Sequence, residues 1–229
     1  MLTEQPVKEL DGCVDIWCPV TREHSPAACA EQIKKGRQIW WYICMQPRAP
    51  YVGIFVDHPG TDLRAWLWQT FKYDVSGILI WSSTYMNSRT AYPDSLQNPY
   101  FDPMSWAAGY SLAPGSKNAW GNGDGRLFYP PEPLSRGKPA EAGDETVATV
   151  RLEMLREGVE DYGYLAILKN LLREKSGALD AKTRAKLEKL LAVPESITAS
   201  MTEYSYDPAP IEKRRREIAE AIESAQSAR

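Results

Sequence analysis

The chain has 229 residues, of which 43% are hydrophobic and 25% are charged, so it can bury the core of one ordinary to large domain. Its formal net charge of −3 argues against a nucleic-acid-binding protein, because phosphates require a positive field. No apolar run reaches the ~20 residues that cross a bilayer, and the first residues have neither the basic nor the apolar part of a secretory signal. We therefore expect a folded domain without a membrane span.

Tryptophan divides the chain unevenly. All eight Trp residues lie within residues 1–120, whereas residues 151–229 are denser in charge. This shift in composition predicts a tryptophan-rich body over residues 1–175 and a charged helical extension over residues 176–229.

Apolar runs and helical stretches alternate over the first 85 residues. Three nearly continuous runs rich in strand-forming residues span 13–19, 38–45 and 77–85. Two helices are expected between them, over 27–35 after Ser25-Pro26 and over 62–73 with Thr61 as the cap. Continuous apolar runs are typical of strands buried on both faces, so this order predicts βαβ units with a parallel sheet.

Residues 86–150 form one long segment that we expect to be irregular, because Pro and Gly recur along it and residues 122–125 (Asn-Gly-Asp-Gly) favour tight turns. Such a segment is usually functional or a linker. Three amphipathic helices are expected after it, over 151–175, 179–191 and 210–226. The basic run 213–216 in the last helix is interpreted as a solvated face with paired charges rather than a nucleic-acid or membrane patch.

The cysteines and histidines predict no metal site. Neither set has the spacing of metal ligands, and there is no C-x-x-C pair among Cys13, Cys18, Cys29, Cys44, His24 and His58. A zinc site is the minor alternative. We interpret the cysteines as reduced thiols that pack as small hydrophobic groups, and we expect no cofactor.

Aromatic residues lie where the three predicted strands end. Trp17, Tyr42, Trp81 and Tyr85 occupy these ends, and the polar Asn87 follows the last one. Parallel sheets place ligand sites at the carboxyl ends of their strands, and sugars need aromatic faces together with directional polar groups. A sugar site is therefore one interpretation, and packing of each ring in the core is the other.

Seven segments occur in a recognisable order along the chain: Thr3-Glu4-Gln5-Pro6, Val14-Asp15-Ile16-Trp17, Trp40-Trp41-Tyr42, Val56-Asp57-His58-Pro59-Gly60, Gly77-Ile78-Leu79-Ile80-Trp81, Asn122-Gly123-Asp124-Gly125 and the run from Val150 to Tyr162. The last of these, Arg-Leu-Glu-Met-Leu-Arg-Glu-Gly-Val-Glu-Asp-Tyr over 151–162, is the most specific. Together they resemble the C-terminal part of the catalytic domain of glycoside hydrolase family 123 (domain-of-unknown-function family 4091), over residues 2–225.

The resemblance implies the C-terminal part of a (β/α)8 TIM-like barrel, followed by C-terminal helices, and a retaining β-N-acetylhexosaminidase that acts on N-acetylgalactosamine. In the substrate-assisted mechanism of that family, the 2-acetamido oxygen attacks the anomeric carbon, one carboxylate orients the amide, and the adjacent one protonates the leaving group. The family's Asp-Glu dyad precedes the segment that matches residues 3–6. We therefore expect this chain to be a fragment without the dyad and inactive alone. Members often act outside the cytoplasm; the sequence itself gives no location.

Two adjacent acidic pairs occur, Asp144-Glu145 and Glu160-Asp161. Neither follows an apolar strand, so neither is expected to form the dyad. Glu160 and Asp161 are instead expected to make surface or interhelix pairs, and Arg151 to tie the last barrel helix to the sheet.

The predicted substrate-binding residues, which are expected to contact a carbohydrate partner, are Glu4, Trp17, Tyr42, Trp81, Tyr85, Asn87 and Asp124. Strand alternation places Trp40 and Tyr42 on one face and turns Trp41 toward the covering helices. Two alternatives stay open. The chain could be a non-catalytic carbohydrate-binding or pseudoenzyme module, or an interaction unit that self-associates or joins a missing barrel half, because a partial barrel leaves sheet edges and apolar surface uncovered.

Overall fold

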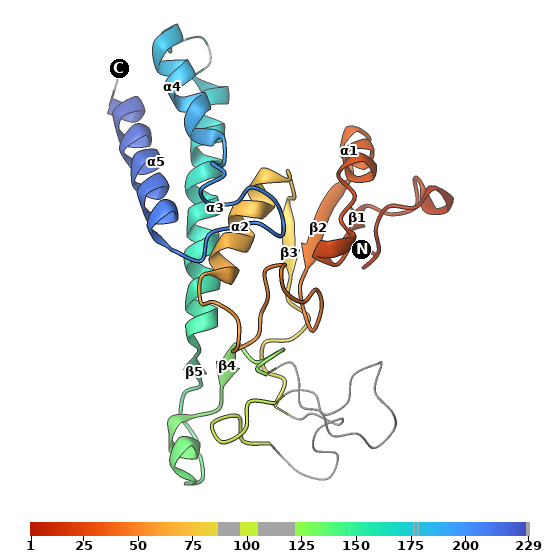
Figure 1. Cartoon of the computed structure of the whole chain (residues 1–229), viewed down its shortest axis with the longest axis vertical. Helices are drawn as coiled ribbons and strands as arrows, with labels where there is room; N and C mark the ends of the chain where they lie inside the picture. Colours follow the sequence, from red (N-terminus) through yellow and green to blue (C-terminus); the bar gives the residue numbers. More distant parts are fainter. Residues whose placement is uncertain (87–96, 105–121, 176, 178, 228–229) are drawn as a thin grey trace.

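The computed structural model describes residues 1–86, 97–104, 122–175, 177 and 179–227. Its sheet has three parallel strands in the order β1-β2-β3: β1 (Ile16–Trp17), β2 (Gln38–Tyr42) and β3 (Gly77–Leu79). Two helices alternate with the strands, α1 (Pro26–Lys34) and α2 (Asp62–Lys72). The predicted alternation of parallel strands and helices is therefore confirmed, with strands that are shorter than the apolar runs that contain them (Figure 1).

Strand register sets which side chains share a face. Trp17 pairs with Ile39, and Tyr42 pairs with Leu79. Leu2 adds a parallel bridge to Trp17 at the outer edge of β1, so the parallel arrangement extends beyond β1. Because partners in adjacent parallel strands point to the same side, Trp17 lies on the face of Ile39.

The face assignment within β2 is confirmed. Ile39 and Trp41 are buried, whereas Trp40 and Tyr42 are half-buried. The Trp41 indole Nε1 donates to Thr70 Oγ1 on α2 at 2.9 Å, which fixes the ring against that helix. One core therefore lies between the sheet and its helices.

Helices α1 and α2 both begin where expected, but only α1 has the expected cap hydrogen bond. Ser25 accepts a hydrogen bond from the Ala28 backbone N–H at 3.5 Å, with Pro26 in the first turn, so the predicted cap of α1 is confirmed. Thr61 precedes α2 but makes no such bond; its backbone is already helical, and its hydroxyl donates to the Tyr206 carbonyl oxygen at 3.1 Å. The expected capping by the Thr61 side chain is thus wrong.

The described part of residues 86–150 is not wholly irregular. It contains an antiparallel pair, β4 (Phe128–Tyr129) with β5 (Val147–Ala148), and a short 3-10 helix over Glu132–Arg136. Two further 3-10 helices, Lys8–Leu10 and Thr21–Glu23, lie earlier in the chain.

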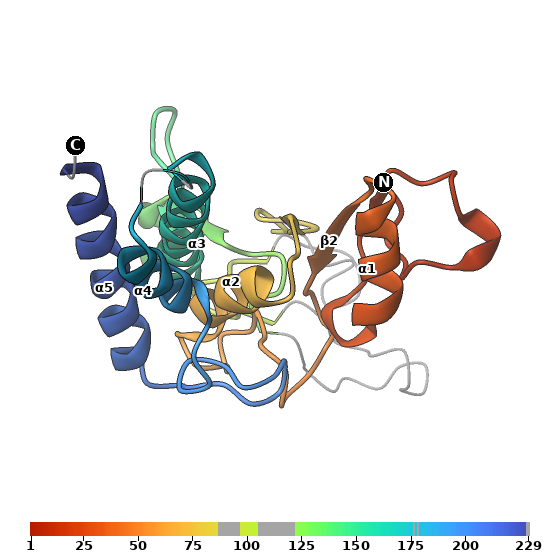
Figure 2. The ribbon, with the colours of Figure 1, turned by 90° about the horizontal axis from the view of Figure 1, so that it is seen from above.

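The three predicted helices after residue 150 are confirmed as α3 (Val150–Glu174), α4 (Ala181–Leu191) and α5 (Ala209–Ser227). Figure 2 shows α2 between the sheet and α3, with α4 and α5 on the far side of α3. Side chains of α3 join both buried clusters: Leu155 packs in the sheet core, and Leu165 in a second core with α4 and α5. Helix α3 thus belongs to both cores, and the expected boundary at residue 175 between the body and the helical extension stays a prediction.

The described residues contain no helix that combines the length and the apolar character required to cross a membrane.

Candidate functional site

An aromatic pair and a carboxylate meet just beyond the end of β3. The Trp81 indole Nε1 donates to Asp124 Oδ1 at 3.0 Å, and the Trp81 and Tyr85 rings pack edge to face with their centroids 5.0 Å apart. Trp81 is 38% exposed, whereas Asp124 is fully buried. The structure thus brings together three predicted site residues, Trp81, Tyr85 and Asp124, and leaves part of the indole open to solvent.

Asp124 is carried by residues 122–126, which we call the 122–126 loop. Gly123 and Gly125 have φ values of +77° and +71°, the left-handed region that glycine adopts without strain. The loop is anchored to its surroundings by the backbone, since the Val56 N–H donates to the Asn122 carbonyl at 2.9 Å and the Tyr85 N–H to the Gly125 carbonyl at 2.8 Å. The expected tight turns at residues 122–125 are therefore present, and they set the direction of Asp124.

Gly125 also allows close approach of the aromatic pair. A Cβ atom at this position would lie 2.7 Å from Cζ2 of Trp81 and 2.9 Å from Cβ of Tyr85. Any larger residue would push these side chains away, so the packing of Trp81 depends on glycine here.

Two guanidinium groups support this region, those of the buried Arg126 and the half-buried Arg151. Arg126 Nε donates to the Tyr85 carbonyl at 2.7 Å, and Arg126 Nη2 donates to Gln97 Oε1. Arg151, on α3, donates to three backbone carbonyls. Burial lowers the pKa of both arginines. The Arg126 Nη1 atom is buried without a hydrogen-bond partner in the part of the chain that the structure describes.

Tyr42 and Glu4 lie near the ends of the neighbouring strands. Burial raises the pKa of Tyr42, and the acidic groups of Cys44, Glu23, Cys18 and Glu4 add to this shift. Glu4 itself is exposed. The Cys18 N–H donates to the Leu2 carbonyl at 2.8 Å and the Tyr42 N–H to the Pro19 carbonyl at 3.1 Å, so Glu4 and Tyr42 follow neighbouring parallel segments at the carboxyl ends of β1 and β2.

Cys44 follows β2 by two residues. Burial raises the pKa of its thiol, and the charge of Asp124 contributes in the same direction. The thiol is thus kept in its neutral form.

Trp17 is not part of this surface. Its side chain is fully buried, and its register with Ile39 turns it to the helix-covered side of the sheet. The prediction that it contacts a ligand conflicts with this burial, because a ring inside the core has no free face. Asn87, also predicted, lies outside the described residues.

A buried polar cluster that the sequence prediction missed lies at the start of α2. Asp62 accepts hydrogen bonds from the Gly53 N–H at 2.9 Å and the Tyr204 hydroxyl at 3.0 Å, and His58 Nδ1 is 3.7 Å away. Burial raises the pKa of Asp62 to about 6. The sequence signal was His58 within the segment Val56-Asp57-His58-Pro59-Gly60, but the partner Tyr204 is too distant in sequence to predict.

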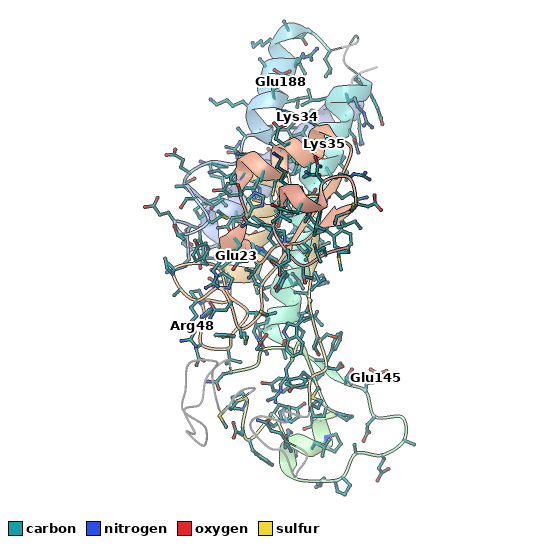
Figure 3. The ribbon with its side chains drawn as sticks, turned by 90° about the vertical axis from the view of Figure 1, so that its right-hand side faces the viewer. Glu23, Lys34, Lys35, Arg48, Glu145 and Glu188 are labelled. Atoms are coloured by element: carbon teal, nitrogen blue, oxygen red, sulfur yellow. The ribbon has the colours of Figure 1, made fainter. Side chains whose placement is uncertain are left out.

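The two acidic pairs of the chain have different surroundings. Figure 3 shows Glu145 on the outer loop before β5, at the opposite end of the molecule from Lys34 of α1. Glu160 accepts from Arg215 of α5 at 2.7 Å, and Asp161 from Arg64 of α2 at 2.6 Å. The expected interhelix pairing of Glu160 and Asp161 is confirmed.

Across the described ranges, the structure contains no cluster of three or more His, Cys, Asp or Glu side chains that could hold a metal ion.

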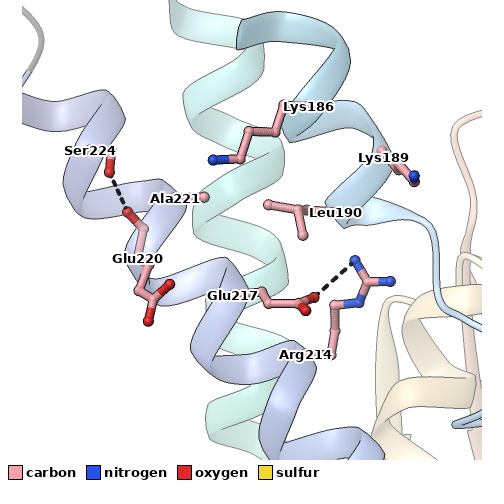
Figure 4. A pocket seen from close by; sticks show the side chains of 8 residues that line it. All are labelled: Lys186, Lys189, Leu190, Arg214, Glu217, Glu220, Ala221 and Ser224. Atoms are coloured by element: carbon pink, nitrogen blue, oxygen red, sulfur yellow. Dashed lines mark hydrogen bonds and ion pairs between the residues drawn. The ribbon is translucent and has the colours of Figure 1, made fainter.

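A groove of about 550 Å³ lies elsewhere, between α4 and α5 (Figure 4). It is lined by Lys186, Lys189, Leu190, Arg214, Glu217, Glu220, Ala221 and Ser224. Its walls are surface charges, of which Arg214 and Glu217 pair at 3.6 Å. These residues come from the C-terminal helices, so the groove is separate from the strand ends.

Comparison with known proteins identifies one family. The model of the catalytic domain of glycoside hydrolase 123 matches residues 3–168. This range includes the three strands, the 122–126 loop and the greater part of α3. No curated protein matches the chain.

Proposed function

The chain belongs to the glycoside hydrolase 123 family, and from this premise we propose that it forms the sugar-contacting wall of a retaining, substrate-assisted β-N-acetylhexosaminidase. The observation that carries the proposal is the arrangement of Trp81, Tyr85 and Asp124 beyond the end of β3. A partly exposed indole, held in one orientation by a buried carboxylate, offers a pyranose ring an apolar face on which to stack.

Each of these groups would have a distinct role. The exposed part of Trp81 would stack on the C–H face of a sugar. Asp124 is fully buried, so it would hold the indole from behind and fix its orientation. Tyr42 and Glu4 would border the subsite, since they follow neighbouring parallel segments of the chain at the strand ends.

The acid and the amide-orienting carboxylate would come from outside the described residues of this chain. Glu160 and Asp161 are engaged in ion pairs between helices, and Asp144 and Glu145 are exposed in a loop. We therefore infer that the chain supplies binding surface, and that a barrel-completing partner supplies the chemical step.

Barrel completion is supported by the sheet itself. Three parallel strands and the Leu2 bridge follow one another in order, with α1 and α2 packed against them, as in consecutive units of a (β/α)8 barrel. The inner face, which carries Trp40 and Tyr42, is only half-buried in this chain. The units that complete the barrel would cover it, supplied by a barrel half that carries the two carboxylates.

The second candidate function is a non-catalytic carbohydrate-binding module. The engagement of Glu160 and Asp161 in structural pairs favours it, because a wall that binds sugar without a dyad would have no catalytic acid of its own.

Binding and turnover distinguish the two parts of the proposal. The purified chain would be titrated with N-acetylgalactosamine and N-acetylglucosamine by following tryptophan indole NMR signals, and assayed with a chromogenic β-N-acetylgalactosaminide. We expect binding that Trp81→Ala abolishes and Tyr206→Ala, an exposed aromatic elsewhere, leaves intact. If the chain binds neither sugar, the proposal that it forms a sugar-contacting surface is refuted. Steady turnover that a mutation within the chain abolishes would refute the assignment of chemistry to a partner.

A further inference from the structure

Arg151, a half-buried arginine, makes an unusual set of contacts. Its Nη1 donates to the carbonyl oxygens of Ile54 at 2.7 Å and Gly123 at 2.6 Å, and its Nη2 donates to that of Arg126 at 2.5 Å. Within the described ranges, no carboxylate pairs with it. The guanidinium therefore donates its hydrogen bonds to backbone oxygens from two separate segments of the chain.

Two of these oxygens enclose Asp124. Gly123 directly precedes Asp124, and Arg126 follows Asp124 by two residues. One guanidinium therefore binds the backbone of the 122–126 loop on both sides of Asp124. The third oxygen, of Ile54, belongs to the connection between β2 and α2. Arg151 therefore fixes the loop relative to the sheet as well as to α3.

The backbone of Gly123 is adapted to this contact. A Cβ atom there would lie 2.6 Å and 2.7 Å from the two terminal nitrogens of Arg151. Glycine is thus needed both for the positive φ and for the approach of the guanidinium. Arg151 was expected to tie its helix to the sheet. Two of its three hydrogen bonds instead go to the 122–126 loop, and the third goes to the connection between β2 and α2.

We propose that Arg151 is a positioning residue of the sugar site, which holds the 122–126 loop so that Asp124 accepts the hydrogen bond of Trp81 and keeps the indole oriented for a sugar. The inference rests on the proposed function, in which Trp81 contacts the ligand and Asp124 orients it. It assigns a role at the site to a helix residue that reaches no ligand itself.

The shape of the arginine side chain is required for this role. Its planar group carries donors that point in fixed directions and can serve separated acceptors at once. A lysine at the same position keeps the charge but offers one compact ammonium group, which cannot reach both flanks of Asp124 with the same geometry. Arg151→Lys should therefore rescue Arg151→Gln only in part.

The first test needs no ligand. The indole N–H signal of Trp81 is identified by its loss in Trp81→Phe, and that of Trp41, which donates to Thr70, serves as an internal reference for the fold. We expect Arg151→Gln to shift the Trp81 signal and speed its hydrogen exchange while the Trp41 signal stays unchanged. The matched control is Arg156→Gln, which removes an exposed arginine from the same helix. An unchanged Trp81 signal in Arg151→Gln overturns the proposal.

The second test measures sugar affinity in a double-mutant cycle. Arg151→Gln should weaken binding of N-acetylgalactosamine by about tenfold, the scale of one lost hydrogen bond to a charged group, and should have no further effect in the Asp124→Ala background, where the acceptor of the Trp81 N–H is gone. Equal effects in both backgrounds overturn the proposal, because a general loss of stability would act regardless of Asp124. If the wild-type chain binds no sugar, the proposed function fails, and the Trp81 signal alone decides whether Arg151 positions the loop.

Discussion

The guanidinium of Arg64 on α2 forms an ion pair with the carboxylate of Asp161 on α3, with Nε and Oδ2 2.6 Å apart and both side chains almost fully buried. The same carboxylate oxygen accepts the indole N–H of Trp68 at 3.0 Å, and Arg64 also reaches Glu212 of α5. One buried carboxylate thus connects the helix that covers the sheet to the helix that follows the 122–126 loop.

Removing the charge of Asp161 should destabilise the protein strongly. In Asp161→Asn the Arg64 guanidinium remains buried and keeps only the half-exposed Glu212 as an acidic partner. We expect a loss of about 3 kcal/mol in the free energy of unfolding, because breaking a buried pair leaves one charge uncompensated. Urea denaturation followed by circular dichroism measures this value.

The matched control for Asp161 is the neighbouring acid. Glu160→Gln removes a partner of Arg215 that is largely exposed, so the free energy of unfolding should fall by less than about 1 kcal/mol. If the two variants lose similar amounts of unfolding free energy, burial of the Arg64–Asp161 pair has no energetic consequence, contrary to the expectation.

Local patterns were sufficient to predict the parts of the fold that depend on short stretches. The alternation Trp40-Trp41-Tyr42 correctly assigned the two faces of β2, because neighbouring side chains in a strand must point to opposite sides. All five α-helices of the described residues were expected, α3, α4 and α5 from apolar spacing, α1 from its Ser25 cap and α2 from the stretch after Thr61.

Long-range pairing could not be predicted in the same way. The face of Trp17 depends on its register with Ile39 in another strand, which no feature of residues 13–19 specifies. The same holds for Thr61, whose hydroxyl is recruited by Tyr206, and for Arg151, whose acceptors at Ile54 and Gly123 are distant in sequence.

Trp41 and Tyr42 should respond oppositely to truncation. Trp41→Ala removes a fully buried ring and its hydrogen bond to Thr70, so it should cost about 3–5 kcal/mol of unfolding free energy. Tyr42→Ala removes a half-buried ring and should cost about 1 kcal/mol. Thermal melting of both variants measures the contrast. A Tyr42→Ala chain that unfolds while Trp41→Ala melts like the wild type would invert the two faces of β2.

Asp62 should make stability depend on pH in the direction opposite to most carboxylates. Burial raises its pKa to about 6 from the ordinary value of 3.8, so the folded protein retains the proton that the unfolded chain loses. Its contribution to stability is complete below about pH 4 and disappears as the pH rises through about 6. Relative to Asp62→Asn, the wild type should lose about 3 kcal/mol of unfolding free energy between about pH 4 and pH 7.

The comparison with Asp62→Asn separates Asp62 from His58. Burial lowers the pKa of His58, so this side chain stabilises the fold increasingly as the pH rises and opposes the effect of Asp62. His58 is present in both proteins, and its contribution cancels in the difference to the extent that the two groups titrate independently. A difference between wild type and variant that is constant over this pH range would refute the raised pKa.

Gly125 offers a test of the aromatic pair that leaves its side chains unchanged. Gly125→Ala places a methyl group 2.7 Å from the Trp81 ring and 2.9 Å from Tyr85, at a φ of +71°. The control is Gly12→Ala, at a φ of +82° with no atom within 4 Å. Both variants should lose about 1–2 kcal/mol of unfolding free energy from the left-handed backbone.

Only Gly125→Ala should carry an additional loss, of about 1–3 kcal/mol, because the new methyl group overpacks a filled space. The displaced indole should also lose its hydrogen bond to Asp124, so the Trp81 indole NMR signal should shift and binding of N-acetylgalactosamine should weaken. Gly12→Ala should leave both unchanged. The expectation fails if both variants lose the same stability and the Trp81 signal does not shift in Gly125→Ala. The position of the ring would then not depend on the close approach at Gly125, and other residues would set the geometry of the candidate site.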